Sequence, residues 1–121
     1  MLDAQRMLRN RMRLQEEQAR LQSELGQLNM RMDEQERPGY GTHMADDASD
    51  VFEQAKNLAV HQRLRQTLQA VQRALEKMDL GTYTVCDRCG QQIDPARLKA
   101  LPYATFCKAC QTLLELAGRS R

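Results

Sequence analysis

The 121-residue sequence contains no tryptophan, and aromatic residues make up only 4% of it. Aromatic side chains usually supply much of the buried area of a globular core, so a large core is not expected. No run approaches the roughly 20 apolar residues that a membrane-spanning helix needs, and the N-terminal residues lack the apolar core of a signal peptide. We therefore expect a cytoplasmic protein with no membrane association. The formal net charge of +2 is too small to indicate nucleic-acid binding by itself.

Charge is distributed unevenly along the sequence. Residues 33–53 hold seven acidic residues and one arginine, or roughly −6 charges. Arginines are frequent on both sides of this segment, at positions 6, 9, 11 and 13 and at positions 63, 65 and 73. The pattern indicates a polarised molecule in which an acidic segment lies between two basic arms.

Two long helices are predicted from periodic apolar residues. The first covers about residues 2–36, where a heptad stripe is formed by Met7, Leu14, Leu21 and Leu28. The second covers about residues 46–79, and Gly81 predicts its end. Its apolar stripe consists of Val51, Ala55, Leu58, Leu64, Leu68, Val71, Leu75 and Met78.

A turn is predicted between these helices, because residues 37–42 contain a proline and two glycines. Two helices of nearly equal length with a short connection favour an antiparallel coiled-coil hairpin over residues 1–80. Such a hairpin would be about 50 Å long, with an acidic tip around residues 37–50. We expect a monomer; the alternative is a coiled coil between two chains.

Four cysteines form two Cys-x-x-Cys pairs, Cys86 with Cys89 and Cys107 with Cys110. The 17 residues between the pairs lie in the range of about 15–20 that is typical of zinc sites. Two sulfurs of one pair can reach a single ion at about 2.3 Å, and two pairs complete a tetrahedron. The four cysteines are therefore predicted to bind one zinc ion. Because all four positions are filled by protein, a structural role is expected in preference to catalysis. Redox Cys-x-x-Cys motifs are the alternative, but no βαβ pattern surrounds them.

The segment around the cysteines has few large apolar residues, so metal binding is expected to contribute much of its folding free energy. Gly90 follows the first pair, where the chain needs unusual backbone angles. The expected small core consists of Val85, Ile93, Leu98, Leu101 and Phe106. Cys110 is expected in a short last helix whose leucines, at positions 113, 114 and 116, pack back on the hairpin. The predicted fold class is thus mainly α, with the hairpin followed by a zinc-finger domain and C-terminal helix over residues 81–121.

The cysteine segment resembles the zinc-finger signature of the DksA/TraR family. The resemblance rests on Gly81-Thr82-Tyr83-Thr84-Val85-Cys86, Cys89-Gly90, Ile93, Arg97-Leu98, Pro102 and Cys107-x-x-Cys110-Gln111. The long hairpin ahead of it is similar to that family's coiled coil. Members of the family bind bacterial RNA polymerase and do not read promoter DNA. The resemblance therefore implies a regulator whose coiled coil enters the secondary channel and modulates initiation, in some cases together with ppGpp.

The family's tip pattern, Asp-x-x-Asp-x-Ala, is matched by Asp47 and Asp50, but Phe52 replaces the alanine. The resemblance implies that Asp46, Asp47 and Asp50 contact the polymerase. Asp47 and Asp50 can equally serve as helix caps, because a carboxylate accepts hydrogen bonds from free N–H groups in the first turn.

Other functions have less support in the sequence. Neither a nucleophile motif nor a phosphate-binding loop nor a paired-carboxylate site occurs, so an enzyme is not expected. A nucleic-acid-binding zinc module is a second hypothesis, based on a modest set of basic residues: Arg88, Arg97, Lys99, Lys108, Arg119 and Arg121. A coiled-coil adaptor that dimerises through the hairpin is the third.

Overall fold

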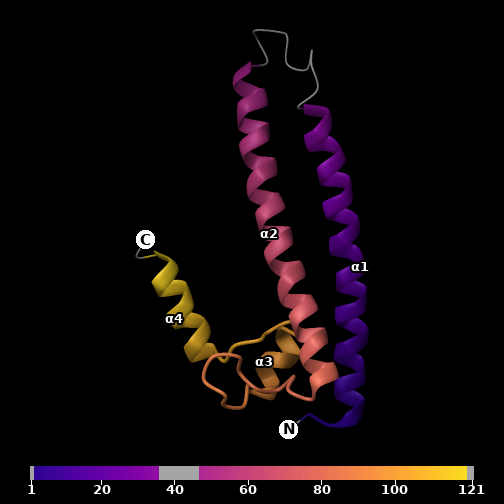
Figure 1. Cartoon of the computed structure of the whole chain (residues 1–121), viewed down its shortest axis with the longest axis vertical. Coiled ribbons are helices and arrows are strands. Elements are labelled where there is room, and N and C mark those ends of the chain that lie inside the picture. Colours follow the sequence, from indigo (N-terminus) through magenta and orange to yellow (C-terminus); the bar gives the residue numbers. More distant parts are fainter. Residues whose placement is uncertain (1, 36–46, 120–121) are drawn as a thin grey trace. The chain divides into compact units, whose positions relative to one another are not determined.

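The computed structural model describes residues 2–35 and 47–119, and within these ranges the chain forms four helices. The long helices are α1 (Ala4–Gln35) and α2 (Asp47–Leu80), and the short ones are α3 (Pro95–Ala100) and α4 (Lys108–Arg119). α1 and α2 run antiparallel (Figure 1). An isolated bridge between Val85 and Gln92 is the only β-pairing in the described part. The predicted mainly α fold, with a helical hairpin, a four-cysteine segment and a short last helix, is confirmed.

The chain divides into two compact units, and both long helices contribute to each of them. Unit 1 consists of Met1–Gln18 and Gln69–Arg121, and unit 2 consists of Ala19–Leu68. Unit 1 therefore contains the whole cysteine segment together with parts of α1 and α2. The division predicted from the sequence, at residues 80 and 81, stays a prediction. None of the helices in the described ranges is long and apolar enough to cross a membrane.

The α1 stripe of unit 2 is buried as predicted. Leu21, Leu25 and Leu28 expose 8% or less of their surface. These three leucines, spaced by four and three residues, give this part of α1 a narrow apolar stripe, which is the pattern expected of a helix that packs along one partner.

The predicted start of the α2 stripe is wrong. Val51 and Leu58 are 66% and 52% exposed, whereas Asn57 is 9% exposed. The reason lies in the register. Counting back from Leu64 by alternating steps of three and four residues leads to His61 and Asn57, one position away from Leu58. Polar residues therefore occupy the inward positions here, and His61 Nε2 lies 2.9 Å from Asn29 Oδ1 of α1.

The core of unit 1 joins the long helices to the cysteine segment. Leu14 of α1 and Val71 and Ala74 of α2 are almost completely buried. Tyr83 is 1% exposed, and its hydroxyl donates to the Pro102 carbonyl at 2.6 Å. The same hydroxyl accepts a hydrogen bond from Asn10 Nδ2 at 3.2 Å. A buried phenol with both partners fixes α1 against the chain that precedes the first cysteine pair and the chain between the two pairs.

The small core predicted beside the cysteines is confirmed in part. Ile93 and Leu98 are 2% and 0% exposed. Val85 and Phe106 are half-buried, and Leu101 is exposed. Leu101 follows the last residue of α3, where the helix has ended and its side chain leaves the buried face. Tyr83, which the prediction omitted, provides the largest buried side chain instead.

The expected packing of α4 is also wrong. Leu113, Leu114 and Leu116 are 51%, 41% and 53% exposed. Cys110, in the first turn, is 3% exposed. Because Cys107 and Cys110 bring the start of α4 to the other cysteines, the helix is positioned from this end, and the leucines do not have to pack to hold it.

Candidate metal centre

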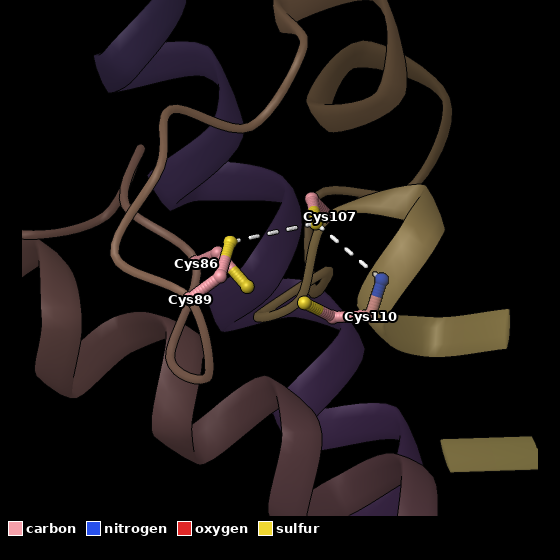
Figure 2. A group of neighbouring side chains, drawn as sticks. All are labelled: Cys86, Cys89, Cys107 and Cys110. Carbon is pink, nitrogen blue, oxygen red and sulfur yellow. Dashed lines mark hydrogen bonds between the residues drawn. The ribbon is translucent and has the colours of Figure 1, made fainter. Parts of the chain in front are cut away.

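Four cysteine sulfurs converge in unit 1. Cys86 and Cys89 lie in the turns after α2, Cys107 directly precedes α4, and Cys110 lies in its first turn. All four Sγ atoms lie within 4.8 Å of one another. The Sγ atoms of Cys89 and Cys107 are 3.8 Å apart (Figure 2). All four cysteines are free of disulfides.

The backbone conformation that places the first pair depends on two glycines. Gly81 has φ of 77° and ends α2: its N–H donates to the Met78 carbonyl at 3.2 Å, and the Thr82 N–H donates to the Lys77 carbonyl at 2.8 Å. This pair of bonds is the Schellman motif. Gly90 has φ of 76°, and its N–H donates to the Cys86 carbonyl at 3.1 Å. Both positions need the left-handed region, which glycine adopts without steric strain.

Backbone N–H groups also point at the sulfurs. The Arg88 N–H donates to Cys86 Sγ at 3.4 Å, and the Cys110 N–H donates to Cys107 Sγ at 3.5 Å. The second of these bonds is drawn in Figure 2. Such donors favour the thiolate over the thiol, because they stabilise negative charge on sulfur.

This arrangement lowers the pKa of the Cys86 thiol and raises that of the Cys110 thiol. Burial acts to raise the pKa of Cys86, but hydrogen bonds from the backbone of Cys89, Cys107 and Arg88 outweigh it and lower the pKa to about 6. For Cys110 the Arg88 guanidinium acts to lower the pKa, but burial and the neighbouring thiols raise it to about 11. The thiols of Cys86 and Cys110 therefore do not both ionise near neutral pH unless a cation offsets the repulsion between the sulfurs.

A cluster of charged side chains attaches the first cysteine pair to α2. Asp87 receives two bonds from Arg73, from Nε to Oδ2 at 3.0 Å and from Nη2 to Oδ1 at 3.1 Å. Lys77 is 1% exposed; its Nζ lies 3.3 Å from Asp87 Oδ1 and donates to the Val85 carbonyl. The residues bonded by this cluster, Val85 and Asp87, are the two neighbours of Cys86.

Sequence reasoning missed this cluster. Arg73 and Lys77 are four residues apart and so share a face of α2, but a lysine in a charged helix is normally solvated. A weak signal was present, since Asp87 stands next to a predicted ligand, where a carboxylate can orient the backbone. The sequence shows Arg88 as a basic residue but does not show its contact with the second cysteine pair: its Nη1 lies 3.6 Å from Cys110 Sγ.

The donor set fits a tetrahedral metal ion. A tetrahedron with bonds of about 2.3 Å places its sulfurs roughly 3.8 Å apart, and the separation of Cys89 and Cys107 has that value. Four thiolates select a thiophilic ion such as zinc over magnesium or calcium. The buried cysteines, Cys86 and Cys110, are contributed one from each pair.

The predicted tip residues are only partly within the described ranges. Asp46 lies outside them, as does the turn predicted around residues 37–42. Asp47 and Asp50 belong to the first turn of α2; the Asp50 side chain is half-buried, and that of Asp47 is not described. Their predicted role in partner binding stays a prediction.

Comparisons with known proteins point to one family. The model of the prokaryotic dksA/traR C4-type zinc finger matches residues 81–116. General stress protein 16O of Bacillus subtilis is 40% identical over 77 residues, which are 64% of this chain and 47% of that protein. The RNA polymerase-binding transcription factor DksA of Haemophilus influenzae is 35% identical over 72 residues, which are 60% of this chain and 50% of that protein.

Solved structures extend the similarity to nearly the whole chain. The transcription factor DksA2 from Pseudomonas aeruginosa has a TM-score of 0.74 and 26% identity, with 97% of this chain and 88% of that chain covered. A structure from Chlamydia trachomatis with a TM-score of 0.62 and 23% identity shows the same fold. The matched segments span about half or less of the curated relatives.

Proposed function

Because the chain belongs to the DksA/TraR family of C4-type zinc-finger proteins, we propose that it is a zinc-binding transcription regulator that acts on bacterial RNA polymerase. Its zinc ligands are Cys86, Cys89, Cys107 and Cys110. The observation that carries this assignment is the convergence of all four Sγ atoms within 4.8 Å.

The zinc in this proposal is structural. Four protein ligands leave no position for water or substrate. When bound, the ion supplies folding free energy by joining the chain after α2 to the start of α4, and apparent values of about 10–16 kcal/mol are typical of such sites. Lys77, Arg73 and Asp87 hold the backbone on both sides of Cys86, and Arg88 places positive charge beside Cys110. No residue in this assignment performs catalysis.

The regulatory part of the proposal is supported by its similarity to relatives that are RNA polymerase-binding transcription factors, such as DksA of Haemophilus influenzae. The chain binds the polymerase as a monomer, inserts its helical hairpin into the secondary channel and modulates initiation. Asp46, together with Asp47 and Asp50 of the first turn of α2, contacts the enzyme. ppGpp assists where the target promoter requires it.

A pull-down with purified bacterial core polymerase tests the proposal, with the chain loaded with zinc. Retention of the chain at a one-to-one ratio is expected. A chain that carries zinc and normal helicity but is not retained would refute polymerase binding. Steeply salt-dependent affinity for bare duplex DNA in place of polymerase binding would favour the nucleic-acid hypothesis, and a dimer in sedimentation would contradict the monomer.

Paired substitutions separate binding from regulation. Asp47→Asn with Asp50→Asn is expected to abolish the effect on transcription in vitro, because two negative charges are removed, while polymerase retention persists. Glu16→Gln, an exposed acidic residue of α1 outside the acidic segment, is the control and leaves both unchanged. If the double variant is no longer retained, the two aspartates anchor the complex and do not act on the enzyme.

A further inference from the structure

The part of α2 that belongs to unit 2 carries an exposed apolar patch. Val51, Phe52 and Leu58 are 66%, 79% and 52% exposed, and Ala55 and Ala59 are exposed as well. These five residues are called the outer patch below. Residues three and four positions apart share a side of a helix, so the outer patch extends over about two turns of α2, or roughly 12 Å.

The outer patch lies on the side of α2 that does not pack on α1. Polar side chains take the inward positions here: Asn57 is 9% exposed, and His61 Nε2 lies 2.9 Å from Asn29 Oδ1 of α1. Ala55 and Ala59, two residues from Asn57 in either direction, lie about 160° around the helix from it. A helix that packs only within a hairpin is expected to turn its apolar residues inward. The reversed order in α2 indicates that the outward apolar side chains serve a contact outside the hairpin.

Phe52 is the largest residue of the outer patch and the most exposed of its large side chains. The other phenylalanine of the sequence, Phe106, is half-buried. Aromatic side chains bury about 150–250 Å² each, and they are frequent among the few residues that dominate the binding energy of an interface. The family's tip pattern has alanine at this position. An aromatic anchor here is therefore a property of this chain, which the family pattern does not imply.

Charge and size indicate the kind of partner. Residues 47–59 contain three acidic residues and one lysine; Asp50 precedes Val51, and Glu53 follows Phe52. A second copy of the chain would bring like charges together, and an anionic lipid surface would repel them. Stable interfaces cover about 800 Å² per partner, more than five side chains, two of them alanine, can supply. The outer patch therefore suits one part of a larger contact with another protein.

We propose that the outer patch docks into an apolar cleft with a basic rim on the partner protein, with Phe52 as its anchor. The inference rests on the proposed function, in which the partner is bacterial RNA polymerase. It deepens that function by assigning affinity to apolar residues of α2 and not to the aspartates that precede them. Burial of Phe52 slows dissociation, whereas the flanking carboxylates act mainly on association and are screened by salt.

Dissociation of the zinc-loaded full chain from immobilised core polymerase tests the proposal. Phe52→Ala, which introduces the residue of the family pattern, is expected to raise the dissociation rate constant about tenfold or more. The control, Met30→Ala, removes a large apolar side chain that is 68% exposed on α1 in unit 2, and it leaves the rate constant within about twofold. Because both side chains are exposed, both variants are expected to keep the helicity of the parent chain. The effect of Phe52→Ala is expected to persist from about 0.05 M to 0.5 M salt, because salt does not screen an apolar contact.

The inference alone is refuted if the parent chain binds polymerase and Phe52→Ala dissociates at the parent rate, if Met30→Ala has an equal effect, or if the effect disappears at high salt. A parent dimer in sedimentation that is lost in Phe52→Ala would assign the outer patch to a second copy. Parent binding to phosphatidylcholine vesicles that is lost in this variant would assign the outer patch to a lipid surface. Either result refutes the inference. A parent chain that carries zinc and normal helicity but does not bind polymerase refutes the proposed function, and the inference with it.

Discussion

Replacing Lys77 with methionine tests whether the charged cluster beside the cysteines stabilises unit 1. Lys77 is 1% exposed, and its ammonium group donates to the Val85 carbonyl and lies 3.3 Å from Asp87 Oδ1. Methionine has a similar volume and length, so Lys77→Met removes the charge without leaving a large cavity. Any loss of stability can then be assigned to the lost interactions.

The expected decrease in the free energy of unfolding depends on which interactions Asp87 and Val85 keep after the substitution. Removing one partner of a buried ion pair costs about 3–5 kcal/mol when the other charge is left alone. Here Asp87 keeps Arg73, and its side chain is 22% exposed, which reduces that penalty. The Val85 carbonyl, however, loses a charged donor, which is worth about 1.5–3 kcal/mol. A decrease of about 3 kcal/mol in the free energy of unfolding is expected.

Urea unfolding of the zinc-loaded chain, followed by circular dichroism, gives the free energy. Competition with a chelator gives zinc affinity, which is expected to fall tenfold or more because the backbone beside Cys86 loses its support. Lys56→Met, at an exposed position of the same helix, is the control and changes stability by less than about 0.5 kcal/mol. If Lys77→Met changes the free energy by less than 1 kcal/mol and leaves zinc affinity unchanged, the cluster does not act as described.

Three further predictions follow from the same unit. Burial acts to raise the pKa of Asp87, but bonds from Arg73 and the charge of Lys77 outweigh it and hold that pKa below its usual value. The Asp87 carboxylate therefore stabilises the folded chain fully above the unfolded pKa of about 3.9, and this stabilisation is lost as the pH falls through the lower folded pKa. In urea titrations, the difference in free energy of unfolding between the parent chain and Asp87→Asn is expected to be constant from pH 7 to 5 and to shrink below about pH 4. Chelation of zinc is expected to disorder residues 82–110 while much of the helical signal of α1 and α2 persists in circular dichroism; complete loss of helicity would show that these parts do not separate. Leu98→Ala is expected to lower the free energy of unfolding by about 2–5 kcal/mol because the side chain is fully buried. Leu113→Ala, at a half-exposed position, is expected to lower it by less than about 1 kcal/mol. Equal decreases for the two variants in thermal unfolding would contradict the described packing of α4.

Features set by short-range sequence patterns could be predicted well. The helix bounds, 2–36 and 46–79, differ by one or two residues from those observed for α1 and α2, because heptad spacing and glycine positions act locally. The four cysteines were identifiable since their two-residue gaps and the 17-residue separation are properties of the chain itself.

The features that the sequence did not predict depend on contacts between residues that are distant along the chain. The stripe of α2 was continued back through Leu58 because apolar residues stood there, whereas the inward position is occupied by Asn57. The burial of Lys77 requires a carbonyl and a carboxylate from the chain beyond α2 to reach its ammonium group. No periodic pattern in the sequence predicts these contacts. A pocket between α1 and α3 likewise joins residues about 90 positions apart, such as Arg9 and Lys99.

The buried hydroxyl of Tyr83 is also an intrinsic spectroscopic probe of the structure around it. The sequence has no tryptophan and three tyrosines, so substitution of Tyr40 and Tyr103 by phenylalanine leaves Tyr83 as the only phenol. Burial raises the pKa of Tyr83 above its usual value, although the Asn10 hydrogen bond opposes the shift. Ionisation of this phenol in alkaline solution, read in the near ultraviolet, therefore signals release of α1 from the chain around the cysteines, without any label being attached.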